Sequence, residues 1–79
     1  MRNVIIYSTP SCHYCHMAKD FFSKNNIQYV DKDLATDEAA RAEAIKKSGQ
    51  LRTPVIDIDG TIVVGFDKAT LKKMLGINP

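Results

Sequence analysis

The chain has 79 residues, 44% of them hydrophobic, and its 11 basic and 9 acidic residues give a net charge of +2. This length suits a single domain, residues 1–79, and the small, dispersed charge favours neither a nucleic-acid partner nor a membrane surface. The apolar run at residues 4–6 is too short for a signal peptide or a membrane span. We therefore expect a cytoplasmic monomer.

A strand, a helix and a second strand are predicted in the first half of the chain. Residues 4–7 (VIIY) are continuously apolar, which predicts a central, parallel strand over residues 3–8. Ser11 is predicted to cap a helix over residues 12–25. Its predicted apolar face consists of Met17, Ala18, Phe21 and Phe22. Residues 27–30 predict the second strand of a right-handed crossover.

A second helix and a hairpin are predicted next. Thr36 is predicted to cap the helix, whose apolar pattern rests mainly on alanines and Ile45. Residues 53–58 and 61–64 then predict two strands joined by Asp-Gly, the signal for a type I′ turn.

A last helix completes the chain. Asp67 is predicted to cap it, Phe66 to pack onto Leu71, and Gly76 to end it. The expected order is β-α-β-α-β-β-α, an α/β protein with a four-stranded mixed sheet flanked by helices. This is the minimal thioredoxin-like fold.

Chemistry is predicted at the start of the first helix, where the only two cysteines, Cys12 and Cys15, are spaced to form a disulfide. The helix end carries partial positive charge and unpaired N–H groups, which favour a thiolate on Cys12 and predict that it is the nucleophile. In a reducing cytoplasm such a pair indicates redox or metal chemistry rather than a permanent bridge. Protonated His13 or His16 could also stabilise the thiolate, although either could simply be solvated.

The same segment allows other interpretations. Cys-x-x-Cys followed by His16 is also the attachment signature for c-type haem, which would make the protein an electron carrier. Cys12, Cys15 and His16 share one helix face and would supply three of the four ligands that zinc prefers. No later Cys or His completes that set, so no metal site is predicted.

Three motifs in order resemble segments of small bacterial glutaredoxin-like proteins: residues 7–15 (YSTPSCHYC), 48–54 (SGQLRTP) and 64–67 (VGFD). The resemblance implies a thiol–disulfide oxidoreductase in which Cys12 attacks and Cys15 resolves. It also implies that Pro54 is a cis-proline facing the sulfurs and that the backbone of Thr53 pairs with a bound peptide or glutathione. The predicted substrate-binding residues are His13, Tyr14, Thr53, Pro54, Gly65, Phe66 and Asp67, the last three at a glutathione carboxylate.

The resemblance also implies the partners. No tightly bound cofactor is expected; glutathione is the expected co-substrate, glutathione or thioredoxin reductase the electron donor, and disulfide-containing proteins the clients. An iron–sulfur cluster held between two protomers by Cys12 and glutathione is a further implied form.

Three departures from the glutaredoxin pattern bear on the donor. His13 replaces the usual proline between the cysteines, Val64 replaces the first residue of a glycine pair, and Thr9 replaces a lysine that helps to bind glutathione. The Gly65-Phe66 pair resembles NrdH-type redoxins, which receive electrons from thioredoxin reductase and serve ribonucleotide reductase. The alternative function is therefore that of an NrdH-type redoxin.

Overall fold

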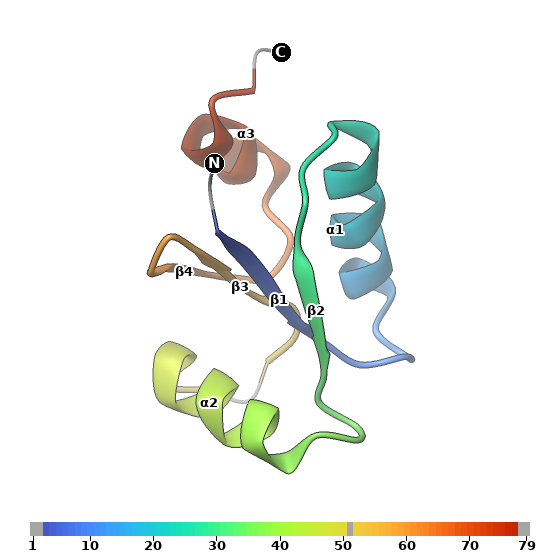
Figure 1. Ribbon diagram of the computed structural model, residues 1–79, viewed down its shortest axis with the longest axis vertical. Coiled ribbons are helices and arrows are strands. Elements are labelled where there is room, and N and C mark those ends of the chain that lie inside the picture. Colours follow the sequence, from blue (N-terminus) through green and yellow to red (C-terminus); the bar gives the residue numbers. More distant parts are fainter. Residues whose placement is uncertain (1–2, 51, 78–79) are drawn as a thin grey trace.

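The computed structural model describes residues 3–50 and 52–77. The elements are β1 (Val4–Ser8), α1 (His13–Lys24), β2 (Val30–Asp33), α2 (Glu38–Ser48), β3 (Val55–Ile58), β4 (Thr61–Val64) and α3 (Lys68–Leu75). They form one mixed sheet in the order β2-β1-β3-β4 (Figure 1). The predicted element order and four-stranded mixed sheet are confirmed.

The first strand is central, as predicted, but it is parallel to only one neighbour. It pairs in parallel with β2, Ile5 opposite Val30, and antiparallel with β3, Ile6 opposite Ile56. The hairpin adds a second antiparallel pair, because β3 and β4 are joined by a two-residue turn rather than by a crossover helix. Both turn residues have positive φ, 51° at Asp59 and 93° at Gly60, which confirms the type I′ prediction.

Two cores lie on opposite faces of the sheet, because successive side chains of a strand point to opposite sides. On one face the strands pack against α1 and α3: Val4, Ile6, Ala18, Phe21, Phe22, Ile56, Ile58, Leu71 and Leu75. On the other face they pack against α2: Tyr7, Leu34, Ala40, Ala44 and Val55.

Helix α1 buries Ala18, Phe21 and Phe22 as predicted, but not Met17, which is 39% exposed. Met17 lies at the margin of the buried stripe, since a helix on a sheet covers only the side chains that point toward the strands. Phe66 packs against the core that contains Leu71, as the staple prediction requires.

Helix α2 rests on the sheet through small side chains. Ala40 and Ala44 are 1% and 2% exposed, whereas Ile45, which was predicted to contribute to the apolar face, is 41% exposed. The N-cap is Asp37 rather than the predicted Thr36, and its Oδ1 accepts the Ala40 N–H at 3.0 Å. The helix therefore begins one residue later than the sequence indicated.

A polar network secures α2 to the sheet. The Tyr7 hydroxyl donates to the Glu43 carboxylate, while Lys47 Nζ lies 2.7 Å from both Tyr7 Oη and Asp57 Oδ2. Burial, followed by the bond to Glu43, raises the pKa of Tyr7. The hydrogen bond from Tyr7, together with Lys32, lowers the pKa of Glu43 to about 2. These charges lie on the face away from α1.

The second strand was predicted at residues 27–30, and this was wrong: β2 begins at Val30. Ile27 and Tyr29 point into the α1 and α3 core from a connecting segment, so their apolar character reflects burial without strand pairing. The predicted strand over residues 53–58 likewise begins only at Val55.

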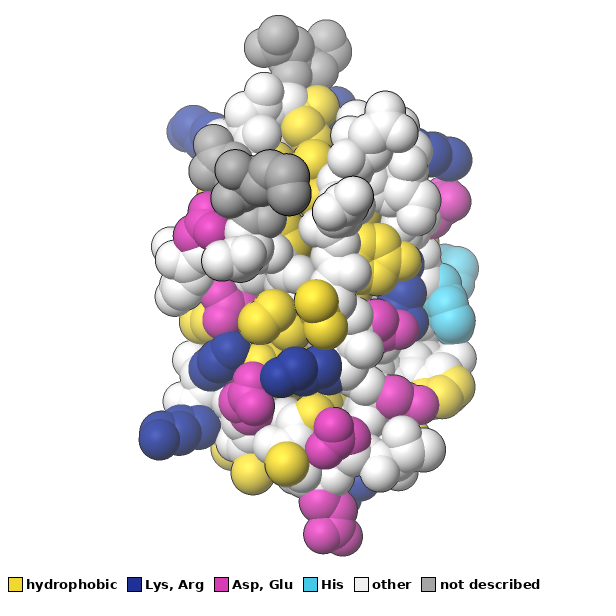
Figure 2. Space-filling model, viewed as in Figure 1, with side chains coloured by type: hydrophobic (Ala, Val, Ile, Leu, Met, Phe, Trp, Pro, Cys, Tyr) yellow, Lys and Arg dark blue, Asp and Glu magenta, His cyan; other side chains and the backbone are white. Residues whose placement is uncertain are grey.

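Neither the surface charges nor the helix lengths point to a particular kind of partner. Basic and acidic side chains are interspersed on the face shown in Figure 2, around small apolar patches. Among the helices that the structure describes, none combines the length and hydrophobicity needed to cross a bilayer.

Candidate active site

The two sulfurs lie at the start of α1, directly after the turn that follows the carboxyl end of β1. Cys12 is the N-cap residue, with φ −83° and ψ 110°, and its Sγ accepts the Cys15 N–H at 3.1 Å. The prediction that Ser11 caps this helix was therefore wrong, because the helix starts one residue later and the cap falls on Cys12. The Cys12 sulfur is thus held against the unpaired N–H groups of the helix end.

The two thiols differ in burial and in acidity. Burial is the largest influence on Cys12 and raises its pKa, but hydrogen bonds from the Cys15 thiol, the Thr53 side chain and the backbone together outweigh it. The pKa of Cys12 consequently lies below that of an ordinary thiol. Cys15 is 0% exposed, and burial, followed by its hydrogen bond to Cys12, raises its pKa to about 11. Both are free thiols, one suited to attack and the other held as a proton donor.

Thr53 and Pro54 lie beside the sulfurs and are joined by a cis peptide bond, as the resemblance implied. Pro54 is fully buried, and its carbonyl accepts the Gly65 N–H at 2.8 Å, which ties this turn to the end of β4. The Thr53 side chain also acts on both thiols, since it lowers the pKa of each. The sequence interpretation considered only its backbone, since nothing in the sequence places its hydroxyl next to a cysteine.

A groove of about 330 Å³ adjoins this turn, and we call it the substrate groove. Its lining residues are Tyr14, Arg52, Thr53, Val64, Gly65 and Phe66. Four of these were predicted to bind substrate, and the structure brings them together from three separate segments. Tyr14 is 59% exposed, so its ring is available to a ligand. Arg52 was not predicted; its position next to the Thr-Pro pair was the only available signal.

Asp67 does not line the substrate groove. It caps α3, as the sequence predicted. Its Oδ1 accepts the Thr70 N–H at 3.2 Å and its Oδ2 the Thr70 hydroxyl at 2.8 Å. The hydroxyl, followed by the backbone N–H, lowers the pKa of this carboxyl. Both carboxylate oxygens are therefore already engaged within the protein.

The two histidines have different surroundings, and neither lines the substrate groove. The exposed His13 ring stands edge-on to Tyr14, with centroids 5.9 Å apart. His16 directs Nε2 toward the Pro10 carbonyl at 2.8 Å, where only the nitrogen can donate. His16 thus positions the turn before Cys12. Histidine side chains are visible at the α1 edge of the molecule in Figure 2.

The cysteines and histidines at the start of α1 are also potential metal ligands. Within residues 3–50 and 52–77, no three His, Cys, Asp or Glu side chains are grouped closely enough to hold a metal ion. The imidazole of His16 is directed to a backbone carbonyl rather than to the sulfurs.

The fold and the cysteine pair together define a small redox protein of the thioredoxin-fold class. The family model for glutaredoxin matches residues 4–63, and the chain belongs to the glutaredoxin family. It is 44% identical over 70 residues to a glutaredoxin-like 8.6 kDa protein in a rubredoxin operon of Clostridium pasteurianum, covering 89% of this chain and 93% of that one. It is 37% identical over 67 residues to glutaredoxin 3 of Escherichia coli strain K12, covering 85% and 81%. The crystal structure of the thioredoxin-like protein BC3987 superposes with a TM-score of 0.86 at 32% identity, covering 91% and 99%.

Proposed function

We propose that this protein is a cytoplasmic thiol–disulfide oxidoreductase in which Cys12 attacks a client disulfide and Cys15 resolves the intermediate. The observation that carries the proposal is the opposite shift of the two thiols: the pKa of Cys12 is lowered, whereas the pKa of Cys15 is raised to about 11. Since a thiolate is the attacking species, this asymmetry supports an order for the two steps.

In the first step the Cys12 thiolate attacks one sulfur of the client disulfide. A Cys12–client disulfide bond forms, the client S–S bond breaks, and the second client sulfur leaves as a thiolate that takes up a proton. The N–H of Cys15 and the Thr53 side chain stabilise the attacking thiolate before this step.

In the second step Cys15 loses its proton and attacks the Cys12 sulfur. The Cys12–Cys15 disulfide forms and the remaining client sulfur leaves as a thiolate, so the client gains two electrons and two protons in all. Burial, the largest influence that raises the pKa of Cys15, persists in the mixed disulfide, but the hydrogen bond with Cys12 and the Cys12 charge, which also raise it, are lost. The resolving thiol therefore ionises more readily after the first step.

The substrate groove supports recognition of an extended chain. The backbone of Thr53, held by the cis bond beside the sulfurs, is placed to pair with an incoming segment, and the exposed Tyr14 ring can pack on it. His13, Gly65, Phe66 and Asp67 remain predicted substrate contacts.

The proposed function has two versions, which differ in the electron donor. A glutaredoxin would accept two electrons from two molecules of glutathione, whereas an NrdH-type redoxin would accept them from thioredoxin reductase. The second version is favoured by one observation: the Gly65 N–H, a donor that a glutathione carboxylate would need, already donates to the Pro54 carbonyl. One donor fewer therefore remains for a glutathione carboxylate.

Turnover of a glutathione mixed disulfide, coupled to glutathione reductase, tests the function, with Cys12→Ser as the blank. We expect Cys12→Ser to lose all disulfide exchange and Cys15→Ser to retain activity on this substrate, because only Cys12 is needed to form the first mixed disulfide. Equal loss in the two variants would contradict the assigned roles. No turnover, in a protein that thioredoxin reductase still reduces, would select the NrdH-type version. A haem or cluster absorption band in the purified protein would instead support an electron carrier.

A further inference from the structure

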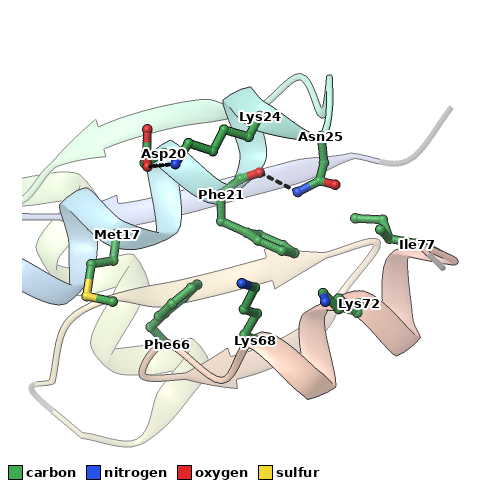
Figure 3. Close-up of a pocket in the computed structure, with 9 residues that line it drawn as sticks. All are labelled: Met17, Asp20, Phe21, Lys24, Asn25, Phe66, Lys68, Lys72 and Ile77. Carbon is green, nitrogen blue, oxygen red and sulfur yellow. Dashed lines mark hydrogen bonds and ion pairs between the residues drawn. The ribbon is translucent and has the colours of Figure 1, made fainter. Parts of the chain in front are cut away.

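A second groove lies between α1 and α3, and we call it the α1–α3 groove. Its volume is about 350 Å³. Its apolar part is formed by Met17, Phe21 and Phe66, and three lysines border it, Lys24, Lys68 and Lys72 (Figure 3). The sequence predicted no binding role for any of these lysines.

The α1–α3 groove adjoins the substrate groove, because Phe66 lines both. Tyr14 and Met17 are three residues apart on α1 and therefore lie on the same side of that helix. They are 59% and 39% exposed, among the most exposed large apolar side chains that the structure describes. An apolar strip thus leads from the sulfurs to Phe21, whose ring stands edge-on to Phe66 with centroids 6.0 Å apart.

The groove carries excess positive charge. Lys24 pairs at 3.1 Å with Asp20, an acidic residue that also lines the groove. Lys68 and Lys72 make no ion pair with any acidic group in residues 3–50 and 52–77. Figure 3 shows the Nζ atoms of both lysines above α3, on the side that faces α1. Two positive charges therefore border an apolar groove without a negative partner in the described chain.

We propose that the α1–α3 groove binds an acidic segment of the client polypeptide, next to the cysteine that Cys12 attacks. This rests on the proposed function. An apolar side chain of the segment packs on Met17 and Phe66, and its carboxylates pair with Lys68 and Lys72. Charge complementarity selects this occupant over a neutral or basic chain, and the adjoining substrate groove places the segment next to the sulfurs.

The dimensions of α3 set the spacing of the two acidic residues. Lys68 and Lys72 are four residues apart on this helix, a rise of about 6 Å. An extended chain covers that distance in roughly two residues. The two acidic residues of the client should consequently lie about two residues apart.

The test uses two synthetic peptides, each with one cysteine as a mixed disulfide with thionitrobenzoate. One carries a leucine and then two glutamates at the inferred spacing; in the other, glutamines replace the glutamates. The reduced protein's Cys12 thiolate attacks the peptide sulfur and releases the coloured thionitrobenzoate anion, whose appearance gives the rate.

Three proteins are compared: the parent, the double variant Lys68→Glu/Lys72→Glu, and Lys46→Glu as a control at an exposed position on α2. We expect the double variant to lose about tenfold in rate on the acidic peptide, since each exposed pair amounts to roughly two- to fivefold and reversal adds repulsion. The glutamine peptide and the control should change by less than about twofold. The preference of the parent for the acidic peptide should also weaken with added salt. An equal loss on both peptides, or no loss on either, overturns the proposal.

A binding measurement separates this proposal from the proposed function. If neither peptide releases thionitrobenzoate faster than with the Cys12→Ser blank, the redox function fails, and the groove is then tested by an NMR titration. The probe is the acidic peptide with serine in place of its cysteine. Saturable shifts of the α1 and α3 amides that the double variant lacks support the groove as a peptide site. Their absence, or the same shifts on raising the protein concentration alone, overturns it, and the second result identifies another copy of the chain as the occupant.

Discussion

Substitution of Cys12 tests whether the attacking sulfur also stabilises α1. Its Sγ accepts the Cys15 N–H as an N-cap. Serine is a favoured N-cap residue, whereas alanine offers no acceptor and costs about 1 kcal/mol, within a range of roughly 0.5–2. For a domain of this size each kcal/mol lowers Tm by about 4–8 °C. Under reducing conditions we therefore expect Cys12→Ala to melt about 4–8 °C below Cys12→Ser, although neither variant is expected to exchange disulfides.

The parent should differ from both variants in its pH dependence. Because the pKa of Cys12 in the folded protein is lower than the ordinary value of 9.0, the thiolate contributes stability that is fully present above pH 9.0. That contribution is lost as the pH falls through the lower pKa of the folded state. The Tm gap between the parent and Cys12→Ala should thus widen from about pH 6 to about pH 9, while the gap between the two variants stays constant. Burial, the largest influence on the pKa of Cys15, is present in all three proteins and cancels in these differences.

Thermal unfolding followed by far-ultraviolet circular dichroism, with reductant present throughout, is the assay. Equal melting of Cys12→Ala and Cys12→Ser would show that the sulfur does not act as a cap. A parent-to-alanine gap that is the same at both ends of the pH range would refute the argument for a stabilised thiolate. Amide exchange of Cys15 gives a local check, because its N–H is the one that the cap protects.

Further predictions concern the two cores. Leu71→Ala removes a side chain with 0% exposure and should lower the free energy of unfolding by about 2–5 kcal/mol in urea titration; a loss well below this range would mean that α3 packs loosely. Ala44→Leu inserts bulk where α2 meets the sheet and should cost about 1–3 kcal/mol. The matched variant Ala42→Leu, at an exposed position of the same helix, should stay within about 0.5 kcal/mol, and equal values for the two would contradict the close packing. Tyr7→Phe should raise the pKa of Glu43 from about 2 toward 4.5, as read from carboxyl chemical shifts. The stability that Glu43 contributes is present above pH 4.5 and lost as the pH falls toward 2, so acid unfolding should become less steep in this variant; an unchanged Glu43 titration would remove Tyr7 from the network.

Local patterns predicted the elements well where the pattern and the tertiary burial agree. The Asp59-Gly60 turn follows from the positive φ that a type I′ turn requires, and the cysteine spacing predicted a helix start beside the sulfurs. Prediction failed where an apolar residue is buried without belonging to the expected element. The apolar Ile27 and Tyr29 predicted a strand, because packing into a core and pairing in a sheet favour the same residue types.

In the candidate site, too, some features were predicted from the sequence and others were not. Cys12, Cys15 and the Thr53-Pro54 pair could be found from motifs, whereas the acidity of the two thiols depends on burial and on hydrogen bonds between distant segments. The Thr53 hydroxyl acts on sulfurs that precede it by about forty residues, and no local pattern encodes that approach. Arg52 likewise becomes part of the substrate groove only after the chain has folded.

The division of the core by the sheet gives the molecule a reactive side and a side that can be used for attachment. The sulfurs and the α1–α3 groove belong to one side, while α2 is anchored on the other by alanines and by the pairing of Lys47 with Asp57. Ile45 is 41% exposed on α2, so a linker at this position would start on the side opposite α1. The protein can therefore be joined through α2 to an electrode, a bead or a larger enzyme with its sulfurs turned toward solution.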